Sequence, residues 1–91
     1  MQVPETLEFG LTPVKGDMCR TLRVHNTGEA AVQCSWEIGQ PFSVTPESAS
    51  IEAGQSAVFV CRFRPPEASV YTVLAACHAD SGYTATVKVW R

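Results

Sequence analysis

Four cysteines and two histidines are the residues of this chain whose types could support metal or redox chemistry. They are Cys19, His25, Cys34, Cys61, Cys77 and His78. No pair of cysteines has the Cys-x-x-Cys spacing that is typical of zinc sites and thiol oxidoreductases, and the histidines add no known ligand spacing. The spacing therefore predicts no metal site.

An even number of cysteines is also compatible with two disulfides in a secreted domain. Cys34, Cys61 and Cys77 have the same alternation phase as neighbouring apolar residues, so a pair could reach the Cα separation of a disulfide, ~5.5–6 Å. The alternative is that they are buried thiols that pack as small apolar groups. Their phase favours buried thiols, and we expect Cys19, on the opposite phase, to be accessible.

The acidic and glycine residues give no catalytic pattern. Glutamates are scattered over predicted turns and outward strand positions, and no Ser, His and Asp group falls on converging loop ends. Glycines occur singly, so no phosphate-binding loop is present. We therefore expect no catalytic residue, no cofactor and no enzymatic activity.

Charge and hydropathy exclude further classes. The 91 residues carry a formal net charge of −2, which argues against nucleic-acid binding. No apolar run approaches the ~20 residues of a membrane helix, and no signal peptide precedes the first predicted strand. The expectation is one domain, residues 1–91, that forms a module of a longer cytoplasmic protein.

Alternating apolar and polar residues predict the elements that hold these side chains. Short runs of period two end at Gly, Asn or Pro, which is typical of strands. The predicted strands are 6–10, 18–25, 31–38, 42–45, 55–64, 70–78 and 83–90. Seven strands at this spacing predict an all-β, immunoglobulin-like sandwich of two sheets.

The same alternation predicts the core and the turns. Asn26 is expected to form hydrogen bonds to backbone groups in a tight turn. Residues 47–50 are expected to form a polar turn. Tyr83 is expected to face the core. The predicted core contains Leu7, Phe9, Leu22, Val24, Trp36, Phe42, Val44, Ile51, Phe59, Phe63, Tyr71, Val73 and Val87.

The order of several short motifs resembles the ASH (ASPM, SPD-2 and Hydin) domain, a branch of the PapD-like and major-sperm-protein-like (MSP-like) sandwiches. The matching residues are Leu7-Glu8-Phe9-Gly10, Leu22, Val24, Asn26, Gly28, Trp36, Phe42, Val44, Pro46, Ile51, Gly54, Phe59, Phe63, Pro65 and Tyr71. The resemblance covers nearly the whole chain and is strongest to hydin-type ciliary proteins. It implies a non-enzymatic scaffold module of cytoskeletal proteins in cilia, flagella or centrosomes. The implied partners are tandem ASH neighbours or microtubule-associated proteins.

Two sets of outward residues are candidate docking sites. The first comprises Leu74, Ala76 and Trp90, because exposed Trp is enriched at interfaces; the alternative is an isolated exposed Trp. The second comprises Arg20, Arg23, Arg62 and Arg64, which could share a face with Val58 and Val60 and bind an acidic partner. The alternative is that these arginines are ordinary solvated charges.

Edge strands are a third route to a partner. The predicted edges are strands 6–10, 42–45 and 83–90. Pro4, Pro13, Pro41 and Pro46 protect the first two, so strand 83–90 is the predicted site of strand addition.

The leading hypothesis is a protein–protein interaction module in a ciliary, flagellar or centrosomal scaffold, monomeric as an isolated domain. The alternative is a disulfide-stapled extracellular or periplasmic adhesion or chaperone domain. A count of free thiols distinguishes the two.

Overall fold

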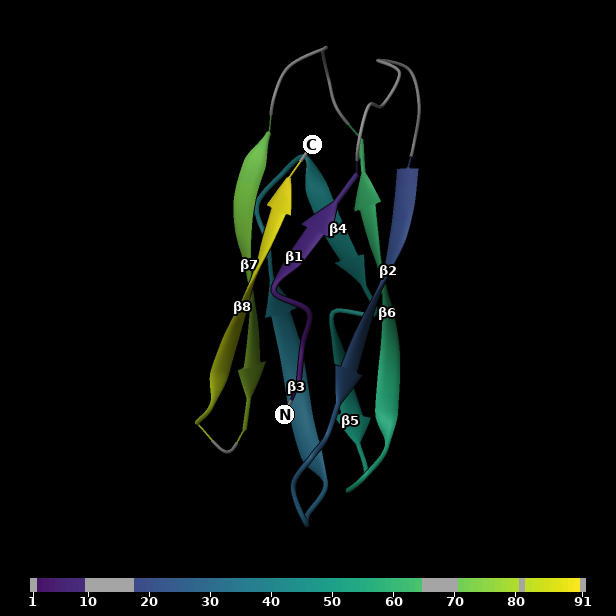
Figure 1. The fold of residues 1–91 in the computed structure, drawn as a ribbon, viewed down its shortest axis with the longest axis vertical. Coiled ribbons are helices and arrows are strands. Elements are labelled where there is room, and N and C mark those ends of the chain that lie inside the picture. The colour runs from purple at the N-terminus through teal and green to yellow at the C-terminus, as the bar shows by residue number, and fades with distance from the viewer. Residues whose placement is uncertain (1, 10–17, 65–70, 81, 91) are drawn as a thin grey trace.

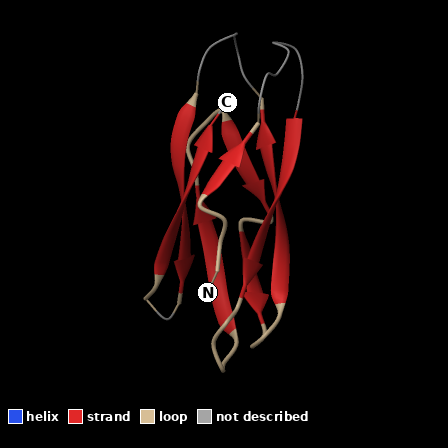
Figure 2. Cartoon of the chain, in the orientation of Figure 1, coloured by secondary structure: helices blue, strands red, loops and turns tan. Residues whose placement is uncertain are grey.

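The chain folds into two β-sheets packed face to face (Figures 1 and 2). The computed structural model describes residues 2–9, 18–64, 71–80 and 82–90. The strands are β1 (Thr6–Glu8), β2 (Met18–His25), β3 (Val32–Glu37), β4 (Phe42–Thr45), β5 (Ser48–Ile51), β6 (Ser56–Phe63), β7 (Thr72–Ala79) and β8 (Thr84–Trp90). One sheet has the order β1-β8-β7-β3-β5 and the other β2-β6-β4. The molecule is elongated, 44 × 18 × 17 Å. No helix among the described residues is long and apolar enough to cross a membrane.

The predicted fold class, an all-β two-sheet sandwich, is confirmed, although the structure has eight described strands rather than seven. The additional strand is β5, where a polar turn at 47–50 was predicted. Its residues pair antiparallel with β3, from Val32 opposite Ile51 to Ser35 opposite Ser48. Small, polar side chains suit this edge position, but they lack the apolar alternation that identifies a strand in sequence.

The predicted edge at residues 83–90 is wrong. β8 lies inside the five-stranded sheet, between β7 and β1. The parallel pairing of β1 with β8 places Thr6 opposite Lys88 and Glu8 opposite Trp90. Before β1, Gln2 pairs with His25 of β2, so the N-terminal segment runs from one sheet to the other (Figure 1). Among the described strands, the edges are β1, β5, β2 and β4.

Alternate side chains of both sheets fill the layer between them. β3 alternates buried and exposed from Val32 to Glu37, and Trp36 packs edge-on against Phe59 with ring centroids 5.8 Å apart. Phe42 stacks on Phe63 at 4.7 Å. Such buried side chains each contribute about 1.5–3 kcal/mol through loss of apolar contact with water.

Most of the predicted core is buried, with a few differences at its margins. Leu7, Tyr71 and Val73 are half-buried and pack against the core. Tyr83 is 51% exposed, contrary to its predicted inward position. It precedes β8, in the connection between β7 and β8, and its carbonyl accepts from the backbone N–H of Ala79. Gly10, Pro13, Pro65 and Val70 lie outside the described residues.

Among the described residues, Asn26 is the buried polar one, and it joins two turns. Its Nδ2 donates to the carbonyl oxygens of Ala30, at 2.8 Å, and Ile51, at 2.9 Å. Its Oδ1 accepts from the backbone N–H of Gly28 at 2.9 Å. The predicted backbone-bonding role of Asn26 is therefore confirmed, and it extends to β5, a strand distant in sequence.

Candidate interaction surfaces

Leu74, Ala76 and Trp90 project from the outer face of the five-stranded sheet, and we call them the β7–β8 patch. In the antiparallel register Thr72 lies opposite Trp90, Leu74 opposite Lys88 and Ala76 opposite Thr86. Leu74 and Trp90 are therefore diagonal neighbours on one face, a separation of ~7–8 Å that an aromatic side chain can span. The structure brings the first set of candidate residues together.

The exposure of the patch follows from where β3 ends. β3 stops at Glu37, which pairs with Ala76, so no residue of β3 stands beside Leu74. Leu74 is 67% exposed, whereas Ala76 and Trp90 are half-buried. Lys88 and Glu8 flank Trp90 on the neighbouring positions of the face. The result is a small apolar area with a charged rim, the arrangement of many protein interfaces.

The second candidate surface is the outer face of the three-stranded sheet. Val58 is 56% exposed and Val60 38% exposed on β6. Arg23 of β2 lies opposite Val58, and Arg62 lies opposite both Cys19 of β2 and Ser43 of β4. Arg64 follows β6 and is exposed. Arg23, Arg62 and Arg64 thus have the outward phase that the sequence analysis gave them.

Arg20 is not part of this outer face, because its alternation phase is that of Leu22 and Val24. Its guanidinium carbon lies 5.6 Å from the Phe9 ring centroid. Nη1 donates to the Cys19 carbonyl at 3.1 Å and Nη2 to the Phe9 carbonyl at 3.4 Å. The guanidinium group therefore lies over the ring of an aromatic core residue, in the geometry of a cation–π contact.

All four cysteines are free thiols. Cys19 is exposed, whereas Cys34, Cys61 and Cys77 are buried. Burial raises the pKa of Cys61 to about 11 and that of Cys77 to about 12, and it also raises the pKa of Cys34, whose thiol hydrogen-bonds to that of Cys77. Protonated thiols are poor nucleophiles, so these three act as core residues.

The histidines lie on different sheets and bond to hydroxyl groups across their strands. His25 Nδ1 lies 2.8 Å from Ser56 Oγ, and His78 Nδ1 lies 3.2 Å from Thr84 Oγ1. Within the described ranges no group of three or more His, Cys, Asp or Glu residues is arranged to hold a metal ion.

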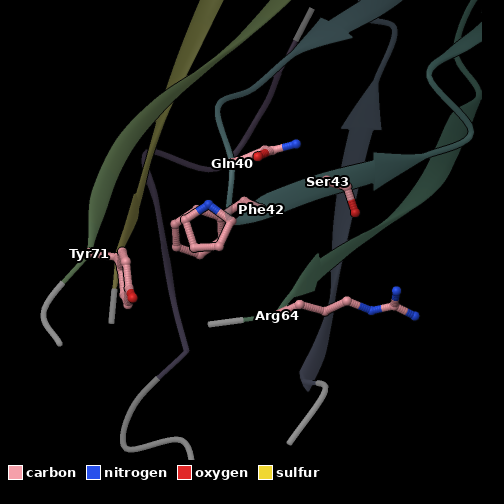
Figure 3. Close-up of a pocket in the computed structure, with 6 residues that line it drawn as sticks. Gln40, Phe42, Ser43, Arg64 and Tyr71 are labelled. Atoms are coloured by element: carbon pink, nitrogen blue, oxygen red, sulfur yellow. The ribbon is translucent and has the colours of Figure 1, made fainter. Parts of the chain in front are cut away.

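An open hollow of about 510 Å³ lies at one end of the sandwich, lined by Gln40, Pro41, Phe42, Ser43, Arg64 and Tyr71. The Arg64 side chain extends away from Phe42 and Tyr71 (Figure 3). The described lining residues include no Asp, Glu, His or Cys that could act as a general acid, general base or thiol nucleophile.

The comparison with known proteins decides the family. The family model "HYDIN/CFA65/VesB-like, Ig-like domain" matches residues 1–89. The chain belongs to this family. It is 42% identical over 89 residues to cilia- and flagella-associated protein 65 of Chlamydomonas reinhardtii, an alignment that spans 98% of this chain and 4% of that protein.

Solved structures of this Ig-like family's wider fold are similar in shape. The ASH/PapD-like domain 7 of human CEP192 superposes with a TM-score of 0.83 at 14% identity, over 98% of this chain and 81% of that chain. SSP-19, an MSP-domain-like protein of Caenorhabditis elegans, gives 0.73 at 10% identity, over 96% and 92%. At these identities the likeness shows the fold alone. The resemblance to ASH, PapD-like and MSP-like domains that the sequence predicted is confirmed.

Proposed function

We propose that this chain is a non-enzymatic protein–protein interaction module of a cilium- or flagellum-associated cytoskeletal scaffold. The β7–β8 patch is the observation that carries the proposal. Leu74 is 67% exposed, beside a half-buried Trp90, on a regular sheet face. An exposed leucine adds little to the stability of the fold. Leucine and tryptophan side chains together on a rigid surface make binding more favourable when a partner excludes water from them.

Family membership supports the location. The 42% identity to a cilia- and flagella-associated protein favours a cytoplasmic, cytoskeletal setting, with neighbouring ASH domains or microtubule-associated proteins as partners. Residues 1–91 would form one module of a longer protein. The alternative of a disulfide-stapled extracellular or periplasmic domain loses its support, because all four cysteines are free thiols.

The test is retention on axonemes. A tagged copy of the chain is expressed in flagellated cells, flagella are extracted with detergent, and the fraction that stays with the axoneme is measured. We expect the wild-type chain to be retained, and retention to fall several-fold for Leu74→Ser and for Trp90→Ala while melting temperatures stay nearly unchanged. The reason is that both side chains face away from the core.

Tyr83→Ser is the matched control, because Tyr83 is another exposed large side chain but lies outside the patch. It should be retained like the wild type. Absence of wild-type retention, or equal retention of Leu74→Ser, would contradict the proposal. A large drop in melting temperature for Trp90→Ala would show instead that Trp90 is a structural residue.

A further inference from the structure

On the outer edge of β2, the backbone groups of Thr21 and Arg23 pair with no residue that the structure describes. β2 is the edge strand of the order β2-β6-β4. The N–H and C=O of His25 both bond to Gln2, at 2.9 and 2.8 Å, so they point away from β6. The backbone N–H and C=O groups of successive residues alternate in direction along a strand, so those of Arg23, Thr21 and Cys19 also point away from β6. Among the described residues only Gln2 forms backbone pairs with this edge, at His25.

Space lies beside this edge. A notch of about 410 Å³ is lined by Gln2, Val3, Pro4, Thr21, Arg23 and His25. The N-terminal segment pairs at Gln2 and then leaves β2 for β8, and Pro4 has no N–H to offer. The edge beyond His25, at Arg23 and Thr21, is therefore open where one more strand would lie.

The charge at this edge has one sign. No Asp or Glu occurs in β2, β6 or β4, whereas β2 contributes Arg20 and Arg23. Arg23 is exposed, and the Arg20 guanidinium donates to the carbonyl of Cys19, which lies on the open edge. The whole chain carries a net charge of −2, whereas the strands of this sheet carry arginines and no carboxylates. Acidic side chains are attracted to such a site, and a second copy of β2 is repelled.

We propose that the β2 edge accepts an extended segment of a partner protein that carries acidic residues at alternate positions, added as a fourth strand. The outward N–H groups of Thr21 and Arg23 donate to carbonyl groups of that segment, and the carbonyl of Thr21 accepts from it. Side chains of an added strand alternate between faces, so acidic residues lie beside Arg23 on the outer face. The residues between them are apolar and pack towards Val3 at the margin of the core, which Val3 contacts. This surface is separate from the β7–β8 patch and does not depend on the proposed function.

The experiment measures binding of the 91-residue chain to three fluorescein-labelled ten-residue peptides by fluorescence anisotropy. The first peptide alternates glutamate and valine, and the second alternates lysine and valine. The third has the same composition as the first, but all its glutamates are at one end. We expect only the first to bind, more weakly at high salt. Arg23→Glu should raise its Kd about five- to tenfold, from the loss and reversal of one charge pair. Lys88→Glu, the same charge change on the other sheet, should leave Kd within twofold.

Backbone pairing has its own readout. Thr21→Pro removes an outward N–H that no described residue uses within the domain, so it should abolish binding while the fold persists. Hydrogen exchange of the wild-type chain should also show the amides of Thr21 and Arg23 slowing on saturation with the first peptide. The amide of Leu22 already faces β6 and should not change.

Three outcomes would overturn the proposal. The first is equal binding of the alternating and segregated glutamate peptides, or equal weakening by Lys88→Glu, because both indicate non-specific charge attraction. The second is unchanged exchange of the Thr21 and Arg23 amides in the bound state. The third is a concentration-dependent dimer in sedimentation that Thr21→Pro abolishes, which assigns the edge to a second copy of the chain. Leu74→Ser should not alter peptide binding, so failure here and failure of the β7–β8 patch are distinguishable.

Discussion

Replacement of Asn26 by alanine gives a direct measure of what holds the turns at one end of the sandwich. Asn26 is 4% exposed, and its Nδ2 donates to the buried Ile51 carbonyl of β5 at 2.9 Å. Leaving that carbonyl unpaired costs about 1–3 kcal/mol. The bonds to Ala30 and Gly28 are only partly buried, so water replaces them in part and each adds about 0.5 kcal/mol.

The expected loss for Asn26→Ala is therefore about 2–4 kcal/mol in the free energy of unfolding. For a domain of this size that corresponds to a fall of roughly 10–25 °C in melting temperature. Urea denaturation followed by tryptophan fluorescence measures the first quantity, and thermal unfolding measures the second. The urea m-value should not change, because the surface exposed on unfolding stays the same.

Two further variants separate the hydrogen bonds from the turn itself. Glu29→Ala changes an exposed residue of the same turn and should stay within about 0.5 kcal/mol of the wild type. Asn26→Asp keeps the acceptor for Gly28 but places a carboxylate against two carbonyl oxygens, so its destabilisation should be larger at pH 7 than at pH 4. A loss below about 1 kcal/mol for Asn26→Ala would refute the reasoning, because it would mean that the Ile51 carbonyl is paired in another way.

Three other predictions concern the cysteines and the core. Cys19 alone should react with a thiol reagent in the native chain, and all four cysteines after unfolding; rapid native labelling of Cys61 or Cys77 would contradict their burial. Because burial raises the pKa of Cys61 from 9.0 to about 11 and of Cys77 to about 12, the unfolded chain loses these protons first, and the free energy of unfolding should fall as pH rises from 9 to 11. Trp36→Ala should cost about 3–5 kcal/mol in urea unfolding. Trp36→Phe should cost under about 1.5 kcal/mol, since Trp36 Nε1 is buried with no hydrogen-bond partner among the described residues.

The inward and outward sides of the central strands were predictable from sequence, because a half-buried strand needs an apolar residue at every second position. Trp36, Phe59 and Phe63 lie where that alternation places them. The same rule gives the exposed position of Leu74. It also assigns Arg20 to the same face as Leu22. The prediction that Arg20 shares an outer face with the other arginines considered only which strand each arginine is on, and so missed this.

The remaining features depend on partners distant in sequence. β5 is a strand because β3 offers it a free edge, and its small residues give no local signal. The covering of β8 by β1 is a parallel pairing between the two ends of the chain, which no local pattern encodes. Tyr83 follows the phase of Val87, yet it lies just before β8 begins and is exposed. Each of these differences lies at a sheet margin, where tertiary pairing outweighs local alternation.

Since the core pattern alone can specify the sandwich, the fold carries no information about the partner. A TM-score of 0.83 at 14% identity shows that very different sequences support this geometry. Specificity must then come from residues that folding leaves unconstrained, which are the outward positions and the open edges. The β7–β8 patch and the β2 edge are of this kind, and they belong to different sheets whose outer faces point in opposite directions (Figure 1). Both are held by paired strands, so binding at either loses little backbone entropy, and two partners could occupy one domain at once.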